Sequence, residues 1–277
     1  MTNIHTEERK IELSERIVVI KGAVEMASGV AWRIYMSNIR KILMLESASP
    51  LAVRREVSFC EAVYEGHKTV EGVEAIKVDD YDNLLQAWGI GKIAVAVDPE
   101  WKLLDQAQPD VVIDAILAKR NLGTQMREAP LVIGLGPGFV AGQDVHLVIE
   151  TNRGHNLGRI ITSGKAAPDT GIPGAIKGYT EERVLRAPCD GEFNARHSIG
   201  NPVKHGDAIG VVAAEPVVAK IDGVIRGLIR SPIGVRQGLK IGDIDPRGLV
   251  DYCNAISEKA RAIAGAVLEA ILRTYNE

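Results

Sequence analysis

The feature that most constrains the fold is a series of short apolar runs, rich in Val and Ile, within the first 150 residues. Such runs are typical of parallel strands that are covered on both faces. Segments with helical spacing or loop composition separate them, and this alternation predicts an α/β fold. We expect a Rossmann-like parallel sheet domain over residues 14–150. The expected strands are residues 16–22, 41–46, 93–97, 111–116, 131–135 and 146–150. The expected helices are residues 28–37 and 51–64, and residues 81–88 and 99–106 are expected to be short helices or loops.

The turn after the first expected strand has the layout of a phosphate-binding turn, because a Gly separates the strand from a helix. Glu46 ends the second strand, where a ribose-binding acid lies in dinucleotide-binding domains. Val24, however, stands where the usual fingerprint needs a second Gly, and Glu25 places a negative charge beside any phosphate. A structural turn and a modified cofactor pocket both remain open. The residues that would form such a pocket are Gly22, Glu25, Ser28, Gly29 and Glu46.

Two further strand ends carry acids. Asp98 follows the run at 93–97, and Asp114 lies in the run at 111–116 with Lys119 shortly after it. Because ligands bind at the carboxyl ends of parallel strands, all three residues are candidates for the same pocket. For Asp98, which precedes a Pro, a turn or helix cap is the favoured interpretation.

Residues 134–178 are unusually rich in Gly, with polar side chains between the glycines. Gly permits positive φ and close backbone approach, so such loops either wrap ligands or pack tightly on other backbone. Arginines in this segment would clamp an anion, and its His and acidic residues would orient the site or exchange protons. The alternative is a connector over residues 151–186 in which Arg and Glu pair structurally. The candidate ligand-binding residues are Gly136, Gly138, Asp144, His146, Glu150, Thr151, Arg153, His155 and Arg159.

The segment 187–248 contains an internal duplication with a constant offset of 32 residues. Seven residues are identical at this offset, so we expect a pseudo-symmetric β module in which each half covers the other. The pattern resembles the barrel-sandwich hybrid of biotinyl and lipoyl domains. The segment 212–219 has no Lys at its tip, so we interpret the module as a scaffold. The identical pairs are Ala187/Ala219, Asp190/Asp222, Gly191/Gly223, Val203/Val235, Gly206/Gly238, Ile209/Ile241 and Gly210/Gly242.

The segment 249–277 completes the chain, and its apolar spacing predicts an amphipathic helix over residues 256–275. Just before it, the acids and bases of residues 240–247 are interpreted as a turn held by ion pairs.

Composition limits the classes of partner and site. A net charge of −3 and 4% aromatic residues offer neither an electrostatic footprint nor a stacking surface for nucleic acid. The chain has no apolar run of membrane-spanning length, and residues 1–15 are polar, so we expect a cytoplasmic protein. Cys60, Cys189 and Cys253 are far apart, so we expect neither a structural zinc site nor a disulfide scaffold.

Several blocks of sequence together resemble one family, the YqeB-type accessory proteins of selenium-dependent molybdenum hydroxylases. The resemblance covers nearly the whole chain, and residues 150–159 are its most specific part. At the first turn relatives tend to read Gly-Ala-Gly-Asp-Leu-Ala, whereas this chain reads Gly-Ala-Val-Glu-Met-Ala over residues 22–27. The matching blocks are residues 21–33, 50–55, 61–66, 134–139, 148–159 and 238–247.

The resemblance implies a maturation factor for a xanthine dehydrogenase-like molybdenum hydroxylase. Its ligand would be an anion, either the molybdenum cofactor or a selenium donor, and no reaction is securely attached to the family. Its Rossmann-like part is also similar to accessory proteins that deliver sulfurated molybdenum cofactor. Two alternatives stay open: an NAD(P)-dependent oxidoreductase and an adaptor for the hydroxylase without a small ligand. The hydroxylase would be the partner, with a homo-oligomer as a further option.

Overall fold

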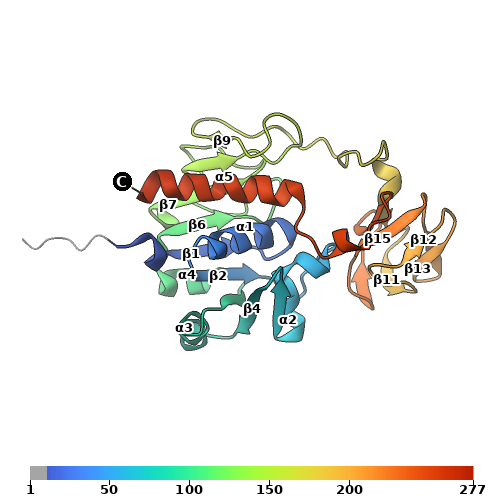
Figure 1. Ribbon diagram of the computed structural model, residues 1–277, viewed down its shortest axis with the longest axis horizontal. Helices are drawn as coiled ribbons and strands as arrows, with labels where there is room; N and C mark the ends of the chain where they lie inside the picture. Colours follow the sequence, from blue (N-terminus) through green and yellow to red (C-terminus); the bar gives the residue numbers. More distant parts are fainter. Residues whose placement is uncertain (1–10, 277) are drawn as a thin grey trace, which may run out of the picture.

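The computed structural model describes residues 11–276, so residues 1–10 of the polar N-terminal segment and residue 277 lie outside it. Two parts are evident in Figure 1: a large sheet between layers of helices, and a smaller all-β module. The chain passes from the sheet to the module and then returns, because its last helix lies back on the sheet. In the described part of the chain, no helix is both long and apolar enough to span a membrane.

The large sheet has nine strands in the order β3-β4-β5-β2-β1-β6-β7-β8-β9. All pairs from β4 to β8 are parallel, and the two edge strands β3 and β9 pair antiparallel. The predicted parallel sheet is therefore confirmed for the centre of a mixed sheet. The strands are β1 (Ile17–Lys21), β2 (Lys41–Glu46), β3 (His67–Val70), β4 (Val73–Val78), β5 (Ile93–Val97), β6 (Val111–Asp114), β7 (Leu131–Leu135), β8 (Leu147–Ile149) and β9 (Ile160–Ile161).

Helices cover both faces of this sheet. On one face α1 and α5 bury an apolar cluster that includes Val18, Ile20 and Ile263. On the other face, α3 and α4 cover a second cluster that includes Val19 and Leu84. Side chains of successive strand residues alternate between the two clusters, which is why the strands are apolar throughout. The helices are α1 (Glu25–Met36), α2 (Ala62–Glu65), α3 (Tyr81–Gly89), α4 (Lys102–Ala107) and α5 (Glu258–Tyr275).

The helix predicted over residues 51–64 is wrong. The segment contains two 3₁₀ turns, Arg55–Val57 and Phe59–Glu61, followed by the single α-helical turn of α2. Tertiary hydrogen bonds use the donors that a helix would need: the Phe59 N–H donates to Ser28 Oγ at 2.8 Å, and the Cys60 N–H donates to the Ala23 carbonyl at 2.8 Å. Apolar spacing cannot reveal such competing partners.

The β module consists of two four-stranded sheets, β10-β17-β15-β12 and β14-β13-β11-β16, around a core that includes Phe193, Ile209 and Ile241. The 32-residue offset relates β11 to β15, β12 to β16 and β13 to β17. Strand β12 of the first repeat pairs with β15 of the second, and β16 of the second pairs with β11 of the first. Each repeat thus contributes one strand to the other's sheet. The strands are β10 (Val184–Arg186), β11 (Gly191–Ala195), β12 (Pro202–Val203), β13 (Ala208–Val212), β14 (Glu215–Val218), β15 (Gly223–Leu228), β16 (Ile233–Val235) and β17 (Lys240–Asp245).

The segment expected to be a turn at residues 240–247 is mainly strand β17, and only its last residues turn. There Arg247 pairs with Asp245 at 2.6 Å, so the expected ion pair is present. The remaining 3₁₀ turns are Leu13–Glu15, Met126–Glu128, Glu181–Arg183 and Val250–Cys253.

The C-terminal amphipathic helix is confirmed as α5, which begins after the N-cap Ser257. It packs on α1 at a very short separation, since a Cβ added at Gly29 would lie 2.9 Å from the Cβ of Ala260. The glycine therefore sets how closely the two helices approach.

We predict that Gly29→Val destabilises the protein by about 1–3 kcal/mol, because the added atoms overpack the contact between α1 and α5. Urea denaturation followed by circular dichroism measures this. Gly265→Ala is the matched control: it lies in α5 with no atom within 4 Å of the added Cβ. It should be neutral or stabilise by roughly 0.5–1 kcal/mol. Equal effects of the two substitutions would contradict the role assigned to Gly29.

Candidate functional site

The carboxyl ends of the parallel strands meet at a topological switch point between β1 and β6. From β1 the chain proceeds outward to β2 and β5, and from β6 it proceeds the other way to β7 and β8. Such a reversal opens a crevice at the strand ends, where α/β proteins bind ligands. A largely apolar cavity of about 590 Å³ lies there, lined in part by Gly22, Glu46 and Trp101.

The turn after β1 is already occupied by a protein carboxylate. Gly22 has φ +94°, and Glu46 Oε2 accepts a hydrogen bond from the Ala23 N–H at 2.9 Å. The acid at the end of β2 thus takes the N–H group that a phosphate would need. Glu25, in the first turn of α1, points instead to Arg54, with 3.3 Å between the paired atoms.

Two of the predicted cofactor residues have structural roles. The buried hydroxyl of Ser28 donates to the Ala23 carbonyl and accepts from the Phe59 N–H, so it anchors the segment after β2 to α1. Gly29 faces α5, on the covered face of the sheet. Neither residue lines the cavity at the switch point.

Beneath this cavity lies a polar network, of which the sequence singled out only Asp114. The ammonium of Lys21 is fully buried and donates to Thr124 Oγ1 at 2.8 Å and to Glu128 Oε2 at 2.7 Å. Thr124 Oγ1 in turn donates to Asp114 Oδ2 at 2.7 Å, and the Trp101 ring centroid lies 3.4 Å from Lys21 Nζ. Burial lowers the pKa of Lys21 and raises the pKa of Asp114, while the network opposes both shifts.

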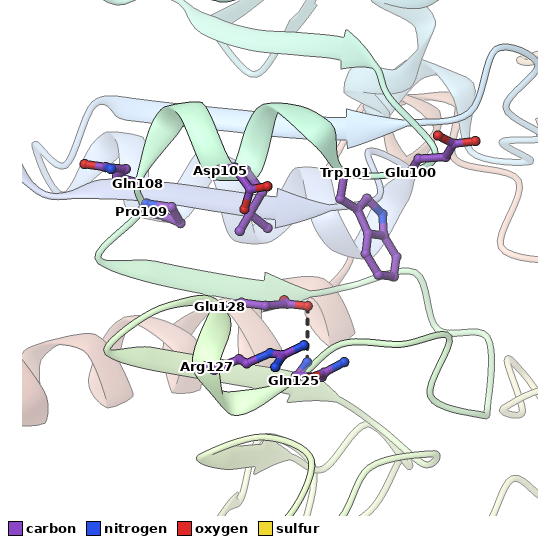
Figure 2. Close-up of a pocket in the computed structure, with 9 residues that line it drawn as sticks. Glu100, Trp101, Asp105, Gln108, Pro109, Gln125, Arg127 and Glu128 are labelled. Atoms are coloured by element: carbon purple, nitrogen blue, oxygen red, sulfur yellow. Dashed lines mark hydrogen bonds between the residues drawn. The ribbon is translucent and has the colours of Figure 1, made fainter.

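A second cavity of about 590 Å³ lies on the other side of Trp101. Figure 2 shows Asp105 and Gln108 on one side of it and Arg127 on the other. The Gln125 N–H donates to Glu128 Oε1, which orients the carboxylate that holds Lys21 (Figure 2). The lining is mostly polar and contains both acidic and basic side chains, so it does not indicate which class of ligand would bind there.

Asp98 and Lys119 do not join the switch-point network. The carboxylate of Asp98 accepts the Leu103 N–H at 2.8 Å and so caps the start of α4. Lys119 extends outward and pairs with Asp169 at 2.6 Å. The capping interpretation of Asp98 agrees with this geometry.

The glycines after β7 allow close packing of the loop. A Cβ at Gly136 would lie 2.5 Å from Thr151 Oγ1, and one at Gly138 would lie 2.7 Å from the Arg120 backbone. In the same loop Asp144 accepts the Val140 N–H. His146 Nδ1 accepts the Val132 N–H, and burial lowers the pKa of that imidazole. Asp144 and His146 thus each satisfy a backbone donor.

Glu150 organises the segment after β8. Its buried carboxylate accepts the N–H groups of Asn152 and Ala167, at 2.6 and 2.7 Å, and so ties two parts of the Gly-rich segment together. Glu150 and Arg159 line a cavity of about 450 Å³. The side chains of Arg159 and His155 are exposed.

Thr151 and Arg153 meet a residue that the sequence did not single out, Lys259 in the first turn of α5. The three side chains line a cavity of about 130 Å³, which Asp169 also lines. Arg153 pairs with Glu258, and Asp169 pairs with Lys119. Lys259 has no ion-pair partner among residues 11–276, and burial together with the charge of Arg153 lowers its pKa. The sequence could not identify Lys259 as a site residue, because only the packing of α5 on the sheet brings it close to Thr151 and Arg153.

Among the described residues, no group of three or more His, Cys, Asp or Glu side chains is placed to hold a metal ion. Cys60 and Cys253 are buried and Cys189 is partly buried, and all three are free thiols. Burial raises the pKa of the Cys60 thiol.

Comparison with known proteins identifies a relative that aligns with almost the whole chain. The curated Escherichia coli (strain K12) protein named "Uncharacterized protein YqeB" is 48% identical over 262 residues, which is 95% of this chain. The chain belongs to the YqeB family. It spans about half the length of that relative, 48%. No family model matches the chain.

The similarity of this chain to solved structures is weak. The structure titled "TcdA (CsdL)" is 11% identical and has a TM-score of 0.35, covering 96% of this chain and 90% of its own. An aspartoacylase family protein from Mesorhizobium loti is 13% identical with a TM-score of 0.25, covering 76% of this chain and 58% of its own. At these TM-scores neither likeness supports an inference about activity.

We predict that Thr124→Val destabilises this YqeB-family protein by about 1–3 kcal/mol, because it removes hydrogen bonds to the buried groups of Lys21 and Asp114. Thermal and urea unfolding measure the effect. Thr69→Val, at an exposed position of β3, makes the same chemical change and should stay within about 0.5 kcal/mol of the unmodified protein. Equal stability of the two variants would show that the network contributes nothing.

Proposed function

We propose that this protein is an accessory factor that binds a small anion in the maturation of a molybdenum hydroxylase. The anion would be a selenium donor or the phosphate group of the molybdenum cofactor. The binding part of the proposal rests on the cavity of Thr151, Arg153 and Lys259. The maturation part rests on the resemblance of the sequence blocks, among which residues 148–159 contribute Thr151 and Arg153 to this cavity.

The observation that carries the proposal is the charge around this cavity. Arg153 and Lys259 both line it. Arg153 is paired with Glu258, and the carboxylate in the lining, Asp169, is paired with Lys119, so Lys259 keeps a positive charge without an ion-pair partner among residues 11–276. Like charges that are held close and partly desolvated destabilise each other unless an anion lies between them. Thr151 adds a hydroxyl group with donor and acceptor capacity. The cavity therefore suits a compact anion better than a whole dinucleotide.

The β module has a supporting role in this proposal. We propose that it is a barrel-sandwich hybrid, in which two interlocked repeats form the two sheets. The β13–β14 hairpin turns at Ala213 and Ala214 and carries no lysine that could be modified. The module would thus position the site and the partner without carrying a covalently bound group.

The partner in this proposal is a xanthine dehydrogenase-like hydroxylase, and the compartment is the cytoplasm. An oxidoreductase that uses NAD(P) is favoured by the strand order and by the apolar cavity at the switch point. It is disfavoured by the hydrogen bond from Ala23 to Glu46, which occupies the phosphate-binding turn. Fluorescence titration with NADH and NADPH separates the two functions, since submicromolar binding would favour the oxidoreductase.

We predict that Lys259→Met weakens sulfate binding by roughly 10- to 100-fold, because one charge-assisted contact worth about 1.5–3 kcal/mol is lost. Isothermal titration calorimetry measures the affinity. Lys220→Met is the control, because Lys220 is exposed on the β module and does not line this cavity. Unchanged affinity of the Lys259 variant would remove the basis for the proposed site.

Sulfate binding should also depend on pH in a defined direction. The pKa of Lys259 is lowered from its ordinary 10.5, and only its protonated form attracts the anion. Affinity is therefore full below the lowered pKa and falls as the pH rises through it, at a pH below 10.5. Sulfate itself stays ionised throughout. The Lys259→Met variant should lose this decline, and an identical decline in the variant would assign it to another group.

The maturation role is tested in cells that lack the gene. Wild-type protein should restore hydroxylase activity, and protein purified from these cells should contain selenium or molybdenum by elemental analysis. The Arg153→Met, Lys259→Met double variant should fold but restore no activity and carry neither element. Full restoration by the double variant would instead favour an adaptor that needs no small ligand.

A further inference from the structure

A separate cavity of about 370 Å³ lies where the β module meets the large sheet domain. One wall belongs to the sheet domain through Arg54, which precedes the 3₁₀ turn Arg55–Val57. The opposite wall belongs to the module through Arg226 on β15 and Arg247 after β17. The start of α5 closes the cavity with Ile256 and Ser257. Residues from both parts of the protein are thus needed to form it.

The charges around this cavity do not balance. Arg226 binds Asp243 through Nε at 2.8 Å and lies 3.4 Å from Asp245, while Arg247 binds Asp245 at 2.6 Å. Arg54 pairs with Glu25, and a further buried arginine, Arg183, also pairs with Asp243. Four guanidinium groups therefore share three carboxylates, and the set is Arg54, Arg183, Arg226 and Arg247 with Glu25, Asp243 and Asp245.

A buried excess of positive charge is unfavourable unless an anion neutralises it. Arg54 is only 5% exposed, and Asp243 and Asp245 are at most 1% exposed, so water screens this inner part of the cluster weakly. The side chain of Arg247 is 32% exposed and lies at the mouth of the cluster. Glu258 also lines the cavity, but it is already paired with Arg153. Among residues 11–276, the carboxylates paired with this cluster thus leave one guanidinium unmatched.

Donor groups remain available in the cluster. The Nε of Arg54 is buried and has no hydrogen-bond partner. Arg247 uses Nε and Nη2 for Asp245, and its Nη1 has no hydrogen-bond partner within residues 11–276. Guanidinium groups with free donors are well suited to carboxylate and phosphate groups.

Apart from Ser257 and Glu258, the rest of the lining is apolar or aromatic. Tyr252 and Ile256 form this part of the wall, and the guanidinium of Arg247 lies 4.4 Å from the centroid of the Tyr252 ring. A ligand that fits must therefore place an anionic group near the arginines and a flat apolar part beside Tyr252. The cavity at Lys259 has no aromatic residue in its lining, so the two sites would take different ligands.

We propose that this interdomain cavity is a second binding site, for a small molecule with one phosphate or carboxylate group and a flat apolar group. Because its walls come from both parts of the chain, the bound molecule holds the β module against the sheet domain. This inference is independent of the proposed function, which rests on Arg153 and Lys259.

The test uses the full chain and phenyl phosphate as the probe, with binding measured by isothermal titration calorimetry. Unmodified protein should bind phenyl phosphate more tightly than inorganic phosphate. Arg247→Met should weaken phenyl phosphate binding by about tenfold or more, because it removes the guanidinium that would bind the phosphate and that stacks on Tyr252. Asp245 keeps Arg226 as a partner in this variant, so the fold should persist. Tyr252→Leu should remove the preference for phenyl phosphate over inorganic phosphate.

Arg236→Met is the matched control, because Arg236 is an exposed arginine of the same β module outside the cavity. Its affinity for phenyl phosphate should equal that of unmodified protein, and so should that of Lys259→Met. Loss of binding in Lys259→Met with full binding in Arg247→Met would place the probe in the other cavity and overturn the proposal. Benzoate in place of phenyl phosphate tells whether the site prefers a carboxylate.

If Arg247→Met proves unstable by circular dichroism, Arg247→Lys replaces it, because the charge is retained while the planar donor pair is lost. Weakened binding in that folded variant supports the site, and unchanged binding overturns it. Phenyl phosphate should also raise the thermal unfolding midpoint of unmodified protein but not that of the Arg247 variant.

Discussion

The close contact between α1 and α5 is the interaction on which the rest of the molecule depends. Gly29 lets the backbone of α1 approach Ala260, and α5 then covers the face of β6, β7 and β8 that no crossover helix covers. The same contact fixes the first turn of α5. Ser257 therefore lies in the cavity between the sheet domain and the β module, and Lys259 lies in the cavity beside the Gly-rich segment. The position of one helix thus determines both candidate binding sites.

The sequence predicted the architecture where patterns are local. Runs such as residues 17–21 and 111–114 are recognisable because both faces of a central parallel strand are buried. The duplication was visible because the Gly turns recur at one offset. Strands β3, β4 and β9 were missed: β3 is largely exposed, β4 alternates buried with more exposed residues instead of forming a continuous apolar run, and β9 is only two residues long. The helix over residues 51–64 failed because Ser28 and Ala23, far away in sequence, supply the hydrogen-bond partners.

The candidate site was predictable only in part, for a similar reason. Arg153 and Thr151 lie in one segment of conspicuous composition, and the structure places both in one cavity. Lys259 is 106 residues away from Arg153 in the numbering and has no local signal. Lys21 resembles the solvent-facing end of a strand in sequence, yet it is fully buried because Thr124, Glu128 and Trp101 surround its ammonium. Electrostatic partners of this kind are a property of the assembled fold.

The exchange of β12 and β16 between the repeats has a consequence for cooperativity. Neither 32-residue repeat can complete its own sheet, because each needs an edge strand from the other. Deleting either repeat would remove at least two strands from one sheet and an edge strand from the other, so both sheets would be damaged at once. The module should accordingly unfold in one all-or-none transition. Its folding should require contacts between residues far apart in sequence to form together.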